Sequence, residues 1–268
     1  MPILAVDIGN THTHFGIAGA DGVDCVRSLP TSELKTKANV LWEWAASSAF
    51  EPNRLEGLAF CSVVPDRTPD LVGFTRSVFP GKPTFQLTHE SDLGFPIEYP
   101  EPSQIGQDRL ANAVAAKAIF GAPAIVIDAG TAVTLDVITQ TKGYEGGIIA
   151  PGLDVMRRYL HEQTALLPRF NSDFQLDSSI GRSTTEAMQI GCLIGFRGMI
   201  GSLVEAIQTE LEERGEVDIQ VIATGRSSKI LDSKKDFPMK IVPDLTLRGL
   251  FEVFCLNEAS AKWIEPDD

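Results

Sequence analysis

The chain has 268 residues, of which 43% are hydrophobic and 22% charged, as in ordinary soluble enzymes. Its net charge of −13 argues against a nucleic-acid-binding protein, because phosphate contacts require clustered lysines and arginines. The cysteines are scattered, which predicts a reduced cytoplasmic protein, and the histidines lack metal-ligand spacing. The apolar runs are about strand length and no signal peptide is evident, so no membrane binding is expected.

The first half of the chain alternates strand-like and helix-like segments. Buried strands are predicted at residues 3–8 and 57–65, and further strands are predicted within residues 14–22, where the chain turns at Gly19 to Gly22, and near 84–87. Helical spacing predicts two helices, at residues 31–50 and 69–78. The second strand turns back from the first, so these two segments are expected to form a hairpin.

A long loop and a strong helix follow. Residues 88–107 are rich in proline and glycine, and a loop of this length inside a compact domain is usually functional or disordered. The presence of Tyr99 favours a functional loop. The next helix begins near Asp108 and is expected to stop at Gly121, because glycine commonly ends helices.

The second half repeats this alternation. A strand–turn–strand unit spans residues 124–138, and a strand, a Pro-Gly turn and a helix follow over residues 144–168. Three further segments are predicted, namely a long helix at 180–215, a strand–turn–helix at 218–231 and a closing helix at 246–263.

Two turn sequences in different halves match each other. They read VDIGNTHT from residue 6 and IDAGTAVT from residue 127, so that Asp7 and Gly9 correspond to Asp128 and Gly130. This repeat predicts an α/β fold made of two similar halves with mixed sheets, residues 1–118 and 119–268. Such halves would face one another across a central cleft, and ligands bind in clefts.

The chemistry of these turns suits a nucleotide. Glycine lets backbone N–H groups approach an anion closely, and a carboxylate beside phosphates suits a hydrated divalent cation such as magnesium. Two turns in one cleft would clamp a nucleotide triphosphate. A single Asp-x-Gly turn is more often only a hairpin with an Asx motif, but two matched copies favour binding. The sequence contains neither GxxxxGK[ST] nor GxGxxG after a strand, which argues against a Walker A loop and a dinucleotide fold.

Two helix starts carry further candidate residues. In IGQDRLAN, Asp108 lies in the first turn, where free N–H groups keep the carboxylate anionic and able to accept an alcohol proton. Arg109 can hold a carboxylate or phosphate in bidentate geometry, although capping and a surface charge pair are the simpler alternative. In GRSTTEAM, Thr184 or Thr185 is the expected N-cap, with donors facing a ligand or capping alone.

Several motifs together resemble one family. They are DIGNTHTHFG, GQDRLANAVAA, DAGTAVTLDVI, GGIIAPGL, GRSTTEAMQIG and PDLTLRGL, with Leu167-Pro168. The chain resembles the type III pantothenate kinases, which are similar to Bvg accessory factors and belong to the superfamily of acetate and sugar kinases, heat-shock chaperones and actin. The resemblance implies a duplicated ribonuclease H-like fold, a homodimer and ATP-dependent phosphorylation of pantothenate, the first step to coenzyme A.

The resemblance also implies residue roles. Asp108 matches the proton acceptor, and Asp128 matches the ligand of a monovalent cation, potassium or ammonium. Thr131 matches a contact to ATP phosphate, and Asp7 is expected near magnesium. The first phosphate loop comprises Asp7, Ile8, Gly9, Asn10, Thr11, His12, Thr13 and His14. The pantothenate-binding positions are Tyr99, Gly106, Gln107, Asp108, Arg109 and Thr184.

One departure and two rival functions stay open. Arg226 stands where the family usually has a second glycine on the adenosine side, which is expected to alter nucleotide affinity or selectivity. The rivals are a non-catalytic nucleotide-binding regulator of the same fold and a kinase for another small alcohol or acid. Small residues along the helix at 185–207 permit close helix packing and favour the homodimer, although they equally suit packing within one chain.

Overall fold

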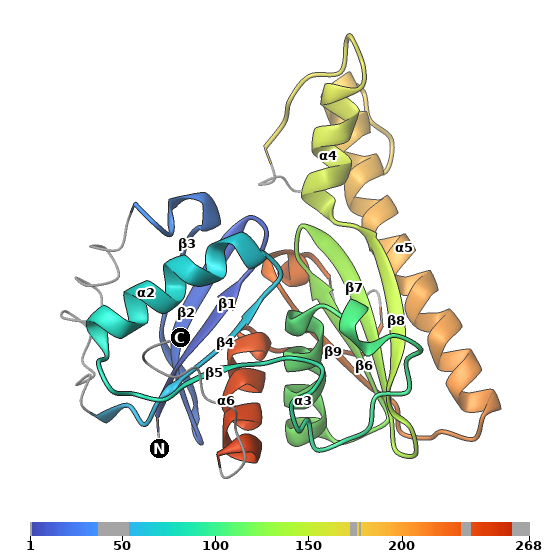
Figure 1. Cartoon of the computed structure of the whole chain (residues 1–268). Helices are drawn as coiled ribbons and strands as arrows, with labels where there is room; N and C mark the ends of the chain where they lie inside the picture. The colour runs from blue at the N-terminus through green and yellow to red at the C-terminus, as the bar shows by residue number, and fades with distance from the viewer. Residues whose placement is uncertain (1, 37–53, 172–175, 177, 232–236, 259–268) are drawn as a thin grey trace. The chain divides into compact units, whose positions relative to one another are not determined.

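The computed structural model describes residues 2–36, 54–171, 176, 178–231 and 237–258. The chain divides into two compact units (Figure 1). The first contains residues 1–121, 141–145 and 244–268, and the second contains residues 122–140 and 146–243. Each unit is built around a five-stranded sheet that carries helices, so the predicted α/β class with mixed sheets is confirmed.

The first sheet has the order β3-β2-β1-β4-β5. Its strands are β1 Ile3–Ile8, β2 His12–Gly19, β3 Gly22–Pro30, β4 Leu58–Ser62 and β5 Thr84–Gln86. Strand β1 runs antiparallel to β2 and parallel to β4. Because β1 and β4 are buried along most of their length, they read as continuous apolar runs in the sequence.

The second sheet repeats this arrangement, with the order β10-β9-β6-β7-β8. Its strands are β6 Ala124–Ala129, β7 Ala132–Thr139, β8 Gly143–Pro151, β9 Gln220–Thr224 and β10 Lys240–Ile241. Strand β6 is antiparallel to β7 and parallel to β9, as β1 is to β2 and β4. The repeated strand order and direction bear out the duplication expected from the two Asp-x-Gly turns.

The helices follow the predicted spacing with two differences. The first unit contains α2 Thr68–Val78, α3 Gln107–Phe120 and α6 Leu245–Asn257, and the second contains α4 Leu153–Glu162 and α5 Thr184–Glu213. Of the helix predicted at 31–50, the structure describes a 3-10 turn at Thr31–Glu33, and residues 37–53 lie outside the described part of the chain. The helix predicted after β9 is a 3-10 turn at Arg226–Ile230.

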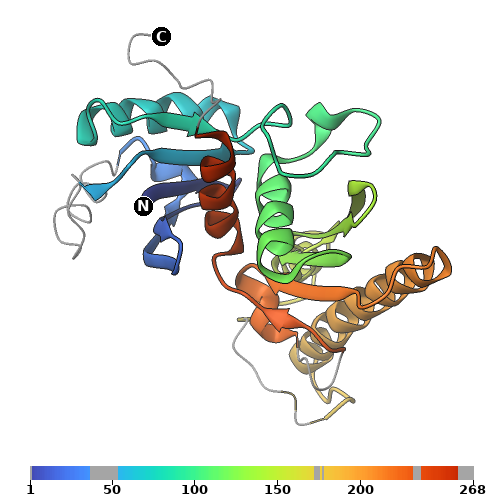
Figure 2. The same cartoon turned by 90° about the horizontal axis from the view of Figure 1, so that it is seen from below.

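Helix α6 closes the first unit beside α3 (Figure 2). The guanidinium of Arg248 donates hydrogen bonds to the carbonyl oxygens of Gly19 at 2.6 Å and Ala20 at 2.9 Å, which lie at the β2–β3 turn. Gly249 faces the backbone of Ala111 in α3, and a Cβ atom at this glycine would overlap the Ala111 carbonyl. Residues of the PDLTLRGL motif at the start of α6 therefore contact both the β2–β3 turn and α3, the helix that carries Asp108.

Helix α5 buries one stripe against the second sheet and exposes the rest. Its buried residues recur mostly every four positions, namely Met188, Cys192, Phe196, Ile200, Val204 and Leu211. Although the uninterrupted apolar runs of α5 are about strand length, as predicted, the helix as a whole is long and apolar enough to cross a membrane by length and composition. A single such helix is weak evidence of a membrane span, since core helices of soluble proteins pass the same test.

We expect Gly249→Ala to lower the free energy of unfolding by about 1–3 kcal/mol, because the added methyl group must displace α6 from α3. Urea unfolding measures the change. The control is Gly73→Ala in α2, where a Cβ meets nothing within 4 Å and the better helix propensity of alanine should stabilise by up to about 1 kcal/mol. Equal effects of the two substitutions would contradict the close α3–α6 approach.

Candidate active site

The site in the first unit begins at the carboxyl end of β1. Asp7 pairs with His14 across the β1–β2 hairpin and with Cys61 across the parallel β1–β4 pair. The apolar residues before it are fully buried, and Asp7 itself is half-buried. Strand pairing on both sides therefore fixes the backbone of Asp7, and the carboxylate lies where the sheet ends.

A thiol lies directly beside this carboxylate. The buried Cys61 donates a hydrogen bond from Sγ to Asp7 Oδ1 at 3.4 Å. Burial raises the pKa of the Cys61 thiol well above its ordinary value, and the negative charges of Asp7 and Asp108 raise this pKa further. The thiol is thus a neutral donor at physiological pH, and it lies close to both candidate carboxylates.

The start of α3 brings Asp108 to the same sheet edge. The Gln107 carboxamide oxygen accepts a hydrogen bond from the Ser62 backbone N–H at 2.8 Å, which ties the first residue of α3 to the end of β4. Gly106, the N-cap, leaves room for the carboxylate, because a Cβ atom there would stand 2.5 Å from Asp108 Oδ1. These two neighbours explain how Asp108 reaches the vicinity of Cys61.

The electrostatics of Asp108 differ from those of a surface aspartate. Desolvation by burial raises the pKa of Asp108 above its ordinary value. Two effects of Arg109 act in the opposite direction, namely a hydrogen bond from its backbone N–H to Asp108 Oδ1 at 2.8 Å and its positive charge. The net upward shift makes this carboxylate a stronger base than a solvated aspartate.

The long loop at residues 88–106 is anchored around α3 and α6. Asn257 in α6 accepts a hydrogen bond from the Asp92 backbone N–H at 3.0 Å and donates one to the Asp92 carbonyl oxygen at 2.8 Å. Within the loop, Ile97 forms a parallel bridge with Tyr144, and Tyr99 follows as a half-buried residue. The loop is thus held in place by side-chain and backbone hydrogen bonds, as a binding loop requires.

Tyr144 connects this loop to Arg109. Its ring is fully buried, and the Arg109 guanidinium lies over the ring, 6.0 Å from its centroid. Arg109 itself is 9% exposed, which is low for an arginine. Local sequence does not point to Tyr144, because its partner lies far along the chain and only a lone aromatic after Gly143 marks it.

The first turn places its predicted residues in two environments. The side chains of Ile8 and Thr13 are fully buried, so only their backbone can meet a phosphate. Asn10 and Thr11 are exposed at the tip, and the side chains of His12 and His14 are half-buried. The predicted phosphate loop therefore presents an exposed tip on a buried base.

The second unit contains the matching turn. Asp128 is half-buried at the end of β6, Thr131 is exposed at the tip, and Gly130 donates its N–H to the Ala132 carbonyl at 3.1 Å. Gly225, at φ +84°, approaches so closely that a Cβ atom would lie 2.5 Å from Asp128 Oδ1. The first turn is one residue longer, since four residues separate Ile8 from Thr13 but three separate Ala129 from Val133.

One predicted capping residue is wrong. The N-cap of α5 is Ser183, whose hydroxyl accepts a hydrogen bond from the Glu186 backbone N–H at 3.2 Å. Thr184 is instead the first residue of the helix, and it is exposed. Serine and threonine are similar N-caps, so local sequence could not decide which of three consecutive hydroxyl residues takes this position.

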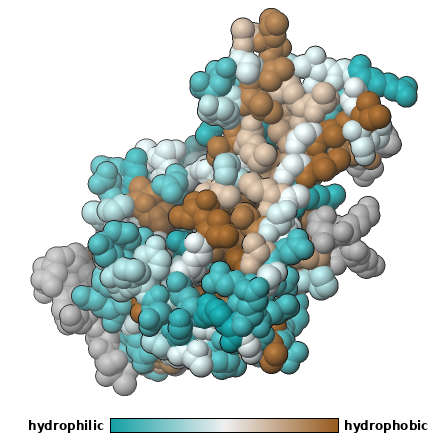
Figure 3. Space-filling model, turned by 90° about the vertical axis from the view of Figure 1, so that its right-hand side faces the viewer, coloured by the Kyte–Doolittle hydropathy of each residue, from teal (hydrophilic) through white to brown (hydrophobic). Residues whose placement is uncertain are grey.

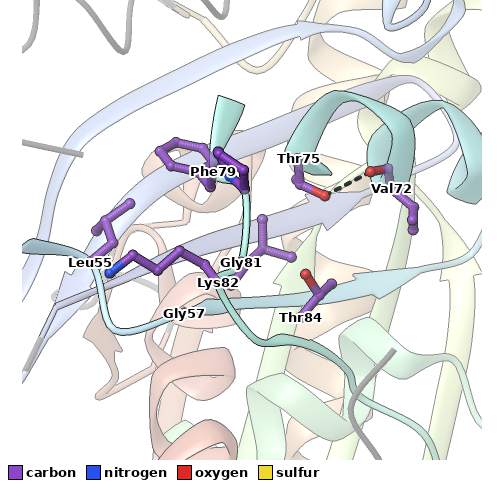
Figure 4. A pocket seen from close by; sticks show the side chains of 10 residues that line it. Leu55, Gly57, Val72, Thr75, Phe79, Gly81, Lys82 and Thr84 are labelled. Atoms are coloured by element: carbon purple, nitrogen blue, oxygen red, sulfur yellow. Dashed lines mark hydrogen bonds between the residues drawn. The ribbon is translucent and has the colours of Figure 1, made fainter. Parts of the chain in front are cut away.

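A cavity of about 170 Å³ in the first unit lies away from the two carboxylates (Figure 4). Its lining includes Leu58 and Thr84, the first residues of β4 and β5, whereas Cys61 and Ser62 lie at the other end of β4. In this cavity the Thr75 hydroxyl donates to the Val72 carbonyl oxygen at 3.0 Å. Its mostly apolar lining holds no carboxylate, so it is not the candidate active site.

Solved structures define the class of protein. A Baf family transcriptional activator from Campylobacter jejuni has a TM-score of 0.60 at 20% identity, covering 96% of this chain and 99% of that chain. The ethanolamine utilization protein EutJ from Carboxydothermus hydrogenoformans has a TM-score of 0.52 at 13% identity, covering 94% and 90%. At such identities the likeness shows the fold alone, which is a duplicated α/β fold with two mixed five-stranded sheets.

Sequence relatives define the family within this class. The family model of the type III pantothenate kinases matches residues 3–206. Proteins named type III pantothenate kinase are 37% identical in Methylacidiphilum infernorum, covering 92% of this chain and 86% of that protein, and 37% identical in Akkermansia muciniphila, covering 93% and 97%. The chain belongs to the type III pantothenate kinase family.

We expect Asp108→Asn to raise the free energy of unfolding at pH 7. Burial raises the folded-state pKa of Asp108 above its unfolded value, so the ionised carboxylate destabilises the folded protein. The wild type therefore loses stability as pH rises from the unfolded pKa, about 4, through the folded pKa, and the variant lacks this loss.

Urea unfolding between pH 3.5 and 8 tests this expectation, and the gain of the variant should shrink towards the acid end. The matched control is Asp70→Asn in the first turn of α2, which breaks an ion pair of 3.3 Å with Arg67 and should bring no gain. A variant at Asp108 that is less stable than the wild type at pH 7 would contradict the desolvation argument.

Proposed function

We propose that this protein transfers the γ-phosphate of ATP to pantothenate, giving 4′-phosphopantothenate, the first step of coenzyme A biosynthesis. Family membership supports this activity. The observation that carries it is the pair of carboxylates, Asp7 and Asp108, that both act on the pKa of Cys61. A kinase needs one carboxylate near the phosphates and one near the acceptor hydroxyl, and this sheet edge provides two.

Asp108 is the proposed proton acceptor. Its raised pKa matches the requirement for a group that takes a proton from the primary hydroxyl of pantothenate while that oxygen attacks phosphorus. The hydrogen bond between Gln107 and Ser62 holds the start of α3 in place during this transfer. Catalysis then depends mainly on positioning and charge neutralisation, as in phosphoryl transfer generally.

The acceptor side is proposed to use the anchored loop and the start of α3. Arg109, with Tyr99 and Gly106, would bind pantothenate, whose carboxylate suits a guanidinium. The Gln107 oxygen already accepts a hydrogen bond from Ser62, so this residue would act on the acceptor through its remaining amide donors or through the helix backbone. Thr184 is proposed as a further contact from the exposed start of α5.

The phosphate side is proposed to use the backbone of both turns, with Asn10 and Thr11 in the first and Thr131 in the second. The kinase family implies a divalent metal ion that accompanies ATP. Among the described residues no group of three or more His, Cys, Asp or Glu side chains could hold a metal alone. Asp7 therefore fits an ion that takes most of its ligands from phosphate and water, as Mg²⁺ does, and that neutralises phosphate charge.

Asp128 is the proposed ligand of a monovalent cation, potassium or ammonium. The carboxylate is half-buried at the end of β6, and the close approach of Gly225 leaves backbone rather than a side chain beside it. Carboxylate and carbonyl oxygens are suitable ligands for such a hard cation. We place the protein in the cytoplasm, where ATP and a metabolic acceptor are available.

A coupled kinase assay with ATP, Mg²⁺, K⁺ and pantothenate tests the activity. We expect wild-type turnover, a fall in kcat of about 10²–10⁴ for Asp108→Asn through loss of the base, and near-normal kcat for the control Asp70→Asn. Replacing K⁺ by Na⁺ should lower the rate if Asp128 binds the cation.

Three outcomes of this assay would change the proposal. Wild-type-like turnover of the Asp108 variant would remove Asp108 from the base role. ATP binding without consumption of pantothenate would indicate a non-catalytic regulator. Turnover with a different small alcohol or acid, but not with pantothenate, would indicate another acceptor.

The homodimer is proposed to form through the exposed face of α5. Ala187, Gly191, Ile194, Gly195 and Gly198 are all exposed on this helix, and a Cβ atom at any of its three named glycines would meet nothing within 4 Å. Figure 3 shows hydrophobic side chains gathered along this side of the second unit. The second unit also exposes the large hydrophobic residues Ile149, Tyr159, Leu166 and Ile180. Small and apolar side chains of this kind let a second copy pack closely.

Sedimentation is expected to give a dimer for the wild type and a monomer for Gly195→Arg, because the arginine would fill the open helix face with a charge. Gly73→Arg in α2 is the control, since Gly73 is equally exposed and open but lies in the first unit. A wild-type monomer at assay concentrations, or a Gly195→Arg dimer, would count against this interface.

A further inference from the structure

Thr31 braces the first turn from the far end of the hairpin that follows it. It comes directly after Pro30, the last residue of β3, and is only 3% exposed. Its hydroxyl donates a hydrogen bond to the Gly9 carbonyl oxygen at 2.6 Å, and its backbone N–H donates to the Thr11 carbonyl oxygen at 3.0 Å. One buried residue thus contacts two carbonyl groups of the predicted phosphate loop.

Hydrogen-bond roles within this cluster follow from the number of protons. Thr31 has one hydroxyl proton, which it gives to Gly9. The hydroxyl of the fully buried Thr13 lies 3.1 Å from that of Thr31, so Thr13 is the donor in this pair. The result is a directed chain from Thr13 to Thr31 to the Gly9 carbonyl.

The carbonyl groups of the turn are therefore held inward. The oxygens of Gly9 and Thr11 accept from Thr31, and the oxygen of His12 accepts from the Gly9 N–H at 3.1 Å. A carbonyl oxygen that faced a phosphate would repel it, whereas backbone N–H groups attract it. Holding three oxygens inward leaves the N–H edge of the exposed tip as the side that meets an anion.

The second unit repeats this brace with a different residue. Gly152 comes directly after Pro151, the last residue of β8, and its N–H donates to the Thr131 carbonyl oxygen at 3.1 Å. A Cβ atom at Gly152 would overlap the carbonyl oxygens of Gly130 and Thr131. Its φ of −72° and ψ of 162° suit any residue, so close approach rather than backbone freedom requires glycine here.

The geometry points to Thr31 and Gly152 as equivalent positioning residues, which orient the first and second phosphate turns by binding the carbonyl groups of those turns. Neither residue touches a substrate in this role. The inference rests on the proposed function, because it assumes that the turns bind the phosphates of ATP. It adds one residue per unit, each placed after the proline that ends the third strand of its sheet.

The test compares Thr31→Val, which keeps the β-branched shape and removes the hydroxyl, with Thr31→Ser, which keeps the hydroxyl. We expect the KM for ATP, and the Kd of a non-hydrolysable ATP analogue with Mg²⁺ measured by calorimetry, to rise about tenfold in Thr31→Val, because one part-buried hydrogen bond to a carbonyl group of the turn is lost. Thr31→Ser should remain within about twofold of the wild type. The KM for pantothenate should stay unchanged in both variants.

Thr75→Val is the matched control. Thr75 is also 3% exposed and also donates its hydroxyl to a carbonyl oxygen, that of Val72 at 3.0 Å, but it lines the cavity at the other end of the sheet. This variant should lose stability without losing affinity for ATP. An equal loss of ATP affinity in Thr31→Val and Thr75→Val, or no loss in Thr31→Val, would overturn the inference. A Thr31→Ser protein as weak as Thr31→Val would overturn it as well.

Gly152→Ala extends the test to the second turn, where the ATP analogue should bind at least about tenfold more weakly because the methyl group displaces the Thr131 carbonyl. Gly201→Ala, at a position of the same unit where a Cβ atom would make only an ordinary contact at 3.9 Å, should leave affinity for the analogue unchanged. The binding readout separates this inference from the proposed function. A wild type that binds the analogue but does not phosphorylate pantothenate would refute only the proposed function, whereas one that does not bind it would refute both.

Discussion

The pairing of β1 with strands on both sides is the constraint on which the candidate site depends. Strand β1 is held by β2 and by β4, so Asp7 at its end has a fixed backbone and a fixed neighbour, Cys61. Burial keeps this thiol neutral, and its hydrogen bond orients the carboxylate. Helix α3 is joined to this edge of the sheet, because the Gln107 side chain accepts a hydrogen bond from Ser62 at the end of β4. This contact brings Asp108 close to the same thiol.

The two units have the same strand order, but different residues donate hydrogen bonds to the carbonyl oxygens of their turns. A turn that binds phosphate must direct its N–H groups outward, and its carbonyl oxygens must then find donors elsewhere. In the first unit Thr31 donates both its hydroxyl and its backbone N–H to carbonyl oxygens of the turn. In the second unit Gly152 donates only its N–H, because its backbone lies too close to the turn for a side chain. The strand order is kept, while the turn length differs by one residue.

Three residues of α6 support the first unit through hydrogen bonds and close packing. Arg248 binds two carbonyl groups at the β2–β3 turn, and Asn257 binds the backbone of the long loop at Asp92. Between them Gly249 permits α6 to lie against α3. Helix α6 therefore supports the hairpin, the loop and the helix that carries Asp108, although none of these three α6 residues is proposed to touch a substrate.

The sequence by itself determined the elements and the residues that lie at their ends. Continuous apolar runs predicted β1, β4 and β6, and glycines with neighbouring polar residues predicted the two turns and the start of α3, because these signals act over a few residues. Local signals could not decide between adjacent hydroxyl residues, so Thr184 or Thr185 was predicted as the N-cap where Ser183 takes that position.

Only the tertiary structure revealed the contacts between distant segments. Cys61 lies 54 residues from Asp7, and Thr31 lies 22 residues from Gly9, yet both bind these residues directly. The contact between the Arg109 guanidinium and the Tyr144 ring could not be predicted from local sequence either. Such partners are set by strand register and helix packing, and neither is encoded in the residues next to the site. Sequence therefore indicated candidate groups for the chemistry, and tertiary structure decided which neighbours hold them in position.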